Sequence, residues 1–158
     1  MNLAAIREQI NVILRGVPDI GSVYDYERLA ADWNVFISRF TDADGLINGW
    51  TISRVATPER WLTNRDYERV YEMVMRGYFG LEDASASEIV FQNRIEAICD
   101  EFRGNDTLNG TCETTCPEFG ALAGLSGIQV GIIEPRFFGN VLCHYGELRL
   151  AAQIKGQR

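Results

Sequence analysis

A chain of 158 residues has the size of one domain and can bury a core. Its apolar fraction of 46% and charged fraction of 23% are ordinary for a globular protein, and no stretch approaches the ~20 apolar residues of a membrane span. A formal net charge of −7, with scattered Lys and Arg, makes nucleic acid a poor first choice of partner.

The N-terminal sequence and the cysteines favour a cytoplasmic chain. Arg7 and Glu8 interrupt the apolar positions before the apolar region of a secretory signal could form. Without an export signal, four cysteines are more often reduced thiols than a disulfide framework.

The first forty residues mix helical and extended patterns. Residues 2–15 place apolar side chains on one face, which predicts an amphipathic helix that ends at Gly16 and Pro18. Residues 21–26 have the composition of a short strand, and residues 29–40 fit either a second helix or a strand-containing connection.

The next stretch is predicted to be extended. A run of turn-forming residues at 41–49 precedes a predicted strand at 47–56. Residues 65–79 fit a helical period as well as strand alternation. Their dense aromatic and β-branched residues, followed by glycines, favour a strand.

Residues 76–104 form the segment around which we expect the rest of the chain to be organised. Ser85 and Glu88 have the spacing of a capping box, which predicts the start of a helix, and Gly104 marks its end. Four apolar residues fall on one stripe of this helix, which we expect to lie across a sheet: Phe91, Ile95, Ile98 and Phe102.

The last third combines a long loop with a predicted hairpin. Residues 105–127 lack a sustained period and indicate either a surface excursion or a segment ordered by a partner. Strands at 128–138 and 141–155 are joined by Gly139 and Asn140, a two-residue hairpin signal. In the last strand Leu142, Leu148, Leu150 and Ile154 share one parity and polar residues the other, which predicts one core face and one solvent face. The whole order predicts a single α+β domain over residues 1–158, with helices packed on a mostly antiparallel β-sheet.

Metal binding is not favoured by the spacing of the candidate ligands. Cys112 and Cys116 lie close together, but Cys143 and His144 would leave a strand on opposite faces, so reduced loop thiols fit better than zinc. Asp42 and Asp44 lack the other positions of a calcium loop, and Asp44 with Gly45 suits a tight turn.

Catalysis is likewise not favoured. His144 is the only histidine, and its parity places it toward the core, so a packed, hydrogen-bonded histidine is favoured over a catalytic base. The glycines match no nucleotide-binding fingerprint. We assign no catalytic, cofactor-binding or metal-binding residue.

The aromatic residues suggest an interface. The chain has more large aromatic residues, among them Trp33, Trp50 and Trp61, than one small core has to bury. Trp50 and Trp61 lie beside turns, and for these two the sequence supports burial in the core and exposure at an interface equally. Our candidate interface residues are Asp42, Asp44, Asn48, Trp50 and Trp61.

Two short sequence motifs recur in a known family. The motifs are GYFGL before the Ser-Glu pair and CHYGELRL near the end. Together with the helix at residues 3–14 and most of residues 67–154, in this order, they make the chain resemble the tail terminator (tail completion) proteins of long-tailed bacteriophages. The resemblance implies an α+β virion protein without catalytic residues or cofactor. It would form a hexameric ring on the head-proximal end of the tail tube, stop tube growth and dock to the head connector.

The resemblance also implies a location and partners. The chain would be assembled in the host cytoplasm into the virion tail or neck, and would contact itself, the tail tube protein and the head connector. DNA would only pass through the ring, and an acidic ring would not grip its phosphates. Two alternatives stay open: another neck component, such as a head-tail adaptor or stopper, and a small cytoplasmic enzyme using His144 or the Cys112 and Cys116 pair.

Overall fold

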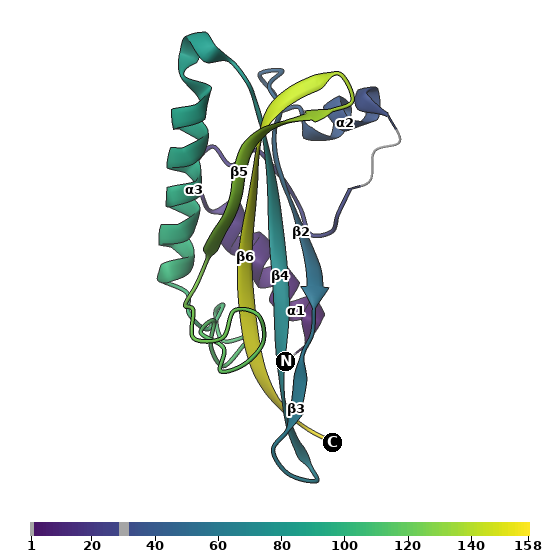
Figure 1. Cartoon of the computed structure of the whole chain (residues 1–158), viewed down its shortest axis with the longest axis vertical. Helices are drawn as coiled ribbons and strands as arrows, with labels where there is room; N and C mark the ends of the chain where they lie inside the picture. The colour runs from purple at the N-terminus through teal and green to yellow at the C-terminus, as the bar shows by residue number, and fades with distance from the viewer. Residues whose placement is uncertain (1, 29–31) are drawn as a thin grey trace.

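The computed structural model of the chain describes residues 2–28 and 32–158 (Figure 1). Its elements, in order, are α1 (Leu3–Arg15), β1 (Ser22–Tyr24), α2 (Trp33–Phe40), β2 (Asn48–Ala56), β3 (Glu59–Trp61), β4 (Asp66–Gly80), the short 3-10 helix η1 (Asp83–Ser85), α3 (Ser87–Arg103), β5 (Gln129–Phe138) and β6 (Val141–Gln157). The strands form one six-stranded sheet in the order β1-β2-β4-β6-β5, with β3 paired to β4. Among the strand pairs of the described residues, β1 with β2 is the only parallel one, which confirms the predicted α+β class and mostly antiparallel sheet.

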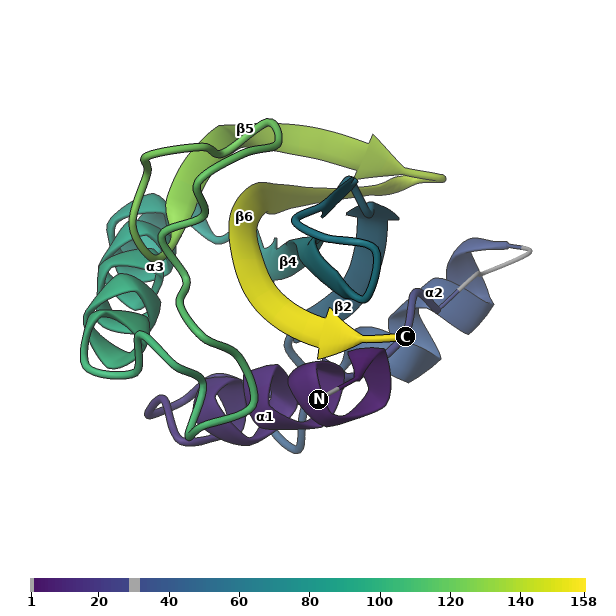
Figure 2. The ribbon, with the colours of Figure 1, turned by 90° about the horizontal axis from the view of Figure 1, so that it is seen from below.

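Two long strands form the middle of the sheet. β4 and β6 pair without interruption from Asp66 opposite Gln157 to Gly80 opposite Cys143, which confirms the strand predicted at residues 65–79. Viewed from below, the sheet curls, and α1 and α3 lie against its outer face (Figure 2). Such long paired strands acquire a marked right-handed twist, and the curl follows from it.

The main core lies between the outer face of the sheet and the two long helices. It unites the apolar stripes of α1 and α3 with alternate residues of β2, β4 and β6: Ile6, Ile10, Leu14, Trp50, Ile52, Met73, Met75, Phe91, Ile95, Ile98, Phe102, Leu148 and Leu150. The stripes predicted from sequence on both helices are therefore confirmed.

The predicted capping box is wrong. Ser85 ends η1, and its hydroxyl lies 3.1 Å from the Glu82 carbonyl oxygen instead of capping a helix. Ala86, with a positive φ of 52°, turns the chain, and α3 begins at Ser87 without a side-chain cap. The Ser87 hydroxyl instead accepts a hydrogen bond of 2.8 Å from the Glu82 N–H. This hydrogen bond lies within the tight turn between β4 and α3, and the turn takes the place of the predicted capping box.

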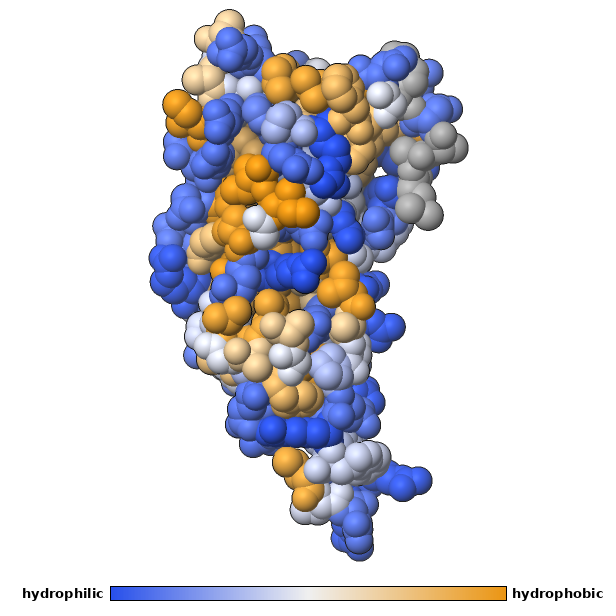
Figure 3. All heavy atoms as spheres, viewed as in Figure 1, coloured by the Kyte–Doolittle hydropathy of each residue, from blue (hydrophilic) through white to orange (hydrophobic). Residues whose placement is uncertain are grey.

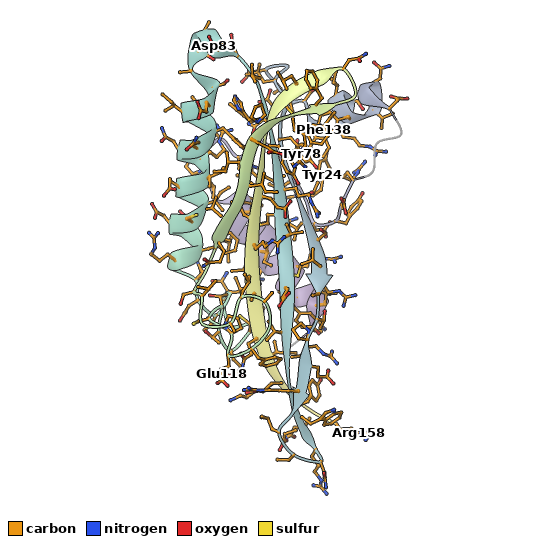
Figure 4. All side chains as sticks on the ribbon, viewed as in Figure 1. Tyr24, Tyr78, Asp83, Glu118, Phe138 and Arg158 are labelled. Carbon is orange, nitrogen blue, oxygen red and sulfur yellow. The ribbon has the colours of Figure 1, made fainter. Side chains whose placement is uncertain are left out.

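The prediction of one solvent face on β6 is confirmed at Arg149 and Lys155, which are exposed, and wrong at Tyr145 and Gln153, which are buried because two other segments cover parts of the inner face. At one end, Phe36 and Phe40 of α2 pack on Tyr78, Cys143 and Tyr145. Tyr24, Tyr78 and Phe138 point toward one another there (Figure 4).

At the other end of the inner face, the long loop covers the sheet. Leu122 of the loop packs on Val70 of β4 and Ala151 of β6. Between these two covered ends the face carries polar side chains, such as Arg76, which donates to the Ser53 hydroxyl at 3.0 Å.

The loop at residues 105–127 packs on its own chain, as a surface excursion would. Leu108 and Cys112 reach the main core. Gln153 of β6 exchanges backbone hydrogen bonds with Glu113 and Thr114. The carboxylate of Glu72 accepts the Ala121 N–H at 2.6 Å. All four cysteines are free thiols, as predicted.

The remaining predictions in the first half are confirmed where the structure describes them. Residues 33–40 are helical, which decides the ambiguity at 29–40, although residues 29–31 and the Trp33 side chain lie outside the described part. The Asp42 carboxylate accepts the N–H groups of Asp44 and Leu46, both at 3.0 Å, and Gly45 adopts a positive φ of 80°, as expected for a tight turn.

The α3 stripe yields a test of the core. Phe91→Ala should lower the free energy of unfolding by ~3 to 5 kcal/mol, because it removes a ring that is 1% exposed between helix and sheet. Ile89→Ala, on the same helix but 62% exposed, is the matched control and should change the free energy by less than ~0.5 kcal/mol. Urea unfolding measures both, and equal values would show that the stripe is not core.

Candidate functional site

The predicted interface residues do not come together on one surface. Asn48 and Trp50 are buried, with the Trp50 indole stacked on Phe91 at a centroid distance of 6.0 Å. Their side chains are therefore not available to a partner. Asp42 serves the turn described above, whereas Trp61 is 56% exposed.

His144 holds the N-terminal end of α3 against the sheet. Its Nε2 lies 2.8 Å from the Ser87 hydroxyl, and both side chains are buried. The imidazole stacks on Phe79 and Phe91, with centroid distances of 6.4 and 5.9 Å. This confirms the predicted packed, hydrogen-bonded core histidine.

Although Ser87 and His144 have the contact of a nucleophile and its base, their surroundings favour a structural role. The Ser87 hydroxyl already accepts the Glu82 N–H, so its proton is free for Nε2 of a neutral imidazole. Burial lowers the pKa of His144, a shift that the Glu88 carboxylate partly opposes. A nucleophile must also be reached by substrate, and Ser87 is only 4% exposed.

The buried thiols are poor nucleophiles. Burial raises the pKa of both Cys112 and Cys143 to about 12, which keeps each thiol protonated at neutral pH. Within residues 2–28 and 32–158, no three His, Cys, Asp or Glu side chains are placed to hold a metal ion. In the same part of the chain, no helix has the length and hydrophobicity needed to cross a membrane.

Exposed apolar side chains gather on one face of β5. We call this face the β5 surface, and it consists of Val130, Ile133, Phe137 and the neighbouring Leu142 of β6. Figure 3 shows hydrophobic atoms collected over β5, beside the hydrophilic margin formed by α3. Clustered exposed apolar side chains, unlike scattered ones, mark interaction sites.

The register explains why these side chains are apolar. Val130 stands opposite Leu148 and Phe137 opposite Leu142, so the β5 surface continues the face that packs on α3. The helix covers this face over β6, while the β5 side chains remain exposed. The sequence signal was the apolar set Val130, Ile133 and Phe137, which a register shift between Val130 and Ile133 brings to one face. Ile132 lies on the other face, with Arg136, whose guanidinium lies over the Tyr145 ring.

The outer edge of β5 is poorly suited to adding another strand. Pro135 has no backbone N–H, and Glu134 and Arg136 form an ion pair beside it. Proline, charges and a bulge all protect an exposed edge from strand pairing. The β5 surface is therefore suited to docking through its side chains rather than through backbone hydrogen bonds.

Neither a known protein-family model nor a curated protein matches this sequence. The candidate site therefore stands on its geometry, and the exposed, apolar β5 surface is the feature that calls for a function.

The burial of His144 predicts a dependence of stability on pH. As the pH falls through 6.5, the ordinary pKa, the unfolded chain takes up a proton at this site before the folded chain does. The free energy of unfolding should then fall, by at most ~1.4 kcal/mol per pH unit, until the lower pKa of the folded chain is reached.

His144→Gln removes this titration and serves as the comparison. Urea unfolding between about pH 7.5 and 5.5 should give a shallower slope for the variant than for the wild type. Parallel slopes would mean that His144 titrates alike in the folded and unfolded chains.

Proposed function

We propose that this chain is a structural protein of the phage virion that acts as a tail terminator. Copies assemble into a closed ring, a homohexamer in the resembling family, on the head-proximal end of the tail tube. The ring stops tube polymerisation and provides the surface to which the head connector docks.

The observation that carries the proposal is the β5 surface. A chain that exposes four neighbouring apolar side chains on one strand and its hairpin partner gains stability when a protein partner covers them. A ring offers each copy such a partner, because every subunit covers a surface of its neighbour.

The charge and the buried reactive groups agree with this role. With a net charge of −7 per chain, a ring of several copies carries a strong negative charge, which favours passage of DNA over retention of it. His144 and Cys112 are committed to the core, so the groups on which an enzyme would depend are used for packing. The proposal assigns the chain no chemical step and no cofactor.

Mass measurement in solution tests the proposal. The purified chain, alone or mixed with tail tube protein, should form a closed oligomer, with six times the 17.8 kDa chain mass expected for a hexamer. Mixing with tube protein should also give short, capped tubes that electron microscopy can count. A chain that stays monomeric and leaves tube length unchanged would rule the function out. Binding to the head portal without any effect on tubes would favour an adaptor or stopper.

A charge placed on the β5 surface should disrupt the oligomer. Phe137→Glu buries a carboxylate in the subunit contact, so the concentration needed for assembly should rise roughly tenfold or more. Val12→Glu is the matched control, because Val12 is 53% exposed on α1, away from β5. The control should assemble like the wild type in analytical ultracentrifugation. Unchanged assembly of Phe137→Glu would remove β5 from the interface.

A further inference from the structure

The opposite edge of the sheet carries a second apolar surface. β2 and β3 pair with β4 on the side away from β6. β1 covers β2 only at Gly49–Thr51, so β3 and the end of β2 that carries Val55 lie at an edge away from β5. We call this surface the β2–β3 edge. Its exposed apolar side chains are Val55 at 50%, Trp61 at 56% and Leu62 at 49%. The β3–β4 hairpin that carries two of them projects beyond the body of the molecule (Figure 1).

The β2–β3 edge is basic. Arg60 pairs with Glu68 and Glu118, and Arg69 pairs with Glu59. Within residues 2–28 and 32–158, no ion pair engages the exposed Arg54 and Arg65. Arg158 is exposed beside the same hairpin (Figure 4). Cations therefore surround the apolar residues of this edge.

The margin of the β5 surface is acidic. α3 runs alongside β5 (Figures 1 and 2), and its exposed side chains include Glu88, Glu96 and Asp100. Of its two cations, Arg103 pairs with Asp100, while Arg94 is half-buried and donates to Asn48 at 3.0 Å. Asp83 adds a further carboxylate just before the helix (Figure 4). The apolar β5 surface is thus bordered by negative charge.

We infer that the β5 surface of one copy docks on the β2–β3 edge of the next copy, with acidic α3 facing the arginines of that edge. The two surfaces match in both respects that decide recognition, since each has an apolar centre and their charges are opposite. This inference rests on the proposed ring and identifies the contact that builds it.

The contact joins two different surfaces of the same chain, so it is heterologous. Each copy that uses its β5 surface leaves its β2–β3 edge free for another copy, and the chain of contacts ends only by closing into a ring. A contact of β5 with β5, by contrast, would bring acidic helices together and stop at a dimer. The separation of charge between the two edges therefore selects a second copy in head-to-tail orientation.

Complementary damage to the two surfaces tests this contact. Phe137→Glu spoils only the β5 surface, and Trp61→Glu spoils only the β2–β3 edge. Each variant alone should be monomeric at concentrations where the wild type forms its oligomer. Mixed in equal amounts, they should form a pair of two chains and nothing larger, because one intact contact can form and the second cannot. Analytical ultracentrifugation resolves these species, and thermal melting verifies that each variant folds.

The outcomes separate the inference from the proposed function. Wild-type-like rings of Trp61→Glu, or two monomeric variants that do not pair when mixed, would overturn the inference while leaving the ring itself intact. A wild-type chain that never assembles, alone or with tail tube protein, would overturn both. If either variant fails to fold, Val130→Lys and Leu62→Lys repeat the test at neighbouring exposed positions.

A charge exchange gives independent evidence. Glu88→Lys with Glu96→Lys on α3, or Arg54→Glu with Arg65→Glu on the β2–β3 edge, should each weaken assembly roughly tenfold by placing like charges opposite one another. The chain carrying all four changes should recover most of the lost affinity. Additive weakening in the fourfold variant would show that these charges do not face each other.

Discussion

The pairing of β4 with β6 is the constraint on which the rest of the structure depends. From Asp66 to Gly80 each residue of β4 has a fixed partner on β6, so one register assigns every side chain of both strands to a face. One face receives α1 and α3. The other receives α2 at one end and the loop at residues 105–127 at the other. A slip by one residue would exchange the two faces and expose the main core.

With both faces occupied, the edges of the sheet are what the molecule offers to others. The buried polar groups serve the interior: the Ser87 hydroxyl joins the start of α3 to His144, and Glu68 is buried among the cations Arg60 and Lys155. The β5 surface and the β2–β3 edge retain exposed apolar side chains. The proposed function in assembly rests on this division between a closed interior and two open edges.

Most of the element order could be predicted from sequence, because local patterns carry it. The stripe through Phe91 and Ile95 predicted α3 and its buried side, and Gly139 with Asn140 predicted the last hairpin. Failures occurred where a distant segment decided the outcome. Ser85 fitted a capping box, yet the reversal from β4 placed it in η1. Tyr145 and Gln153 seemed solvent-facing by parity, yet α2 and the loop cover them.

The sequence by itself determined most of the secondary structure, the apolar stripes and the core position of His144, because these depend on periodicity and on residue chemistry. Only the tertiary structure decided that Trp50 is buried and that the β5 surface is exposed. Both β2 and β5 are rich in apolar residues, and the exposure of these residues depends on whether another element of the fold packs against the strand. Strand order places β2 beneath the helices and leaves β5 at an edge, and no local pattern encodes that order.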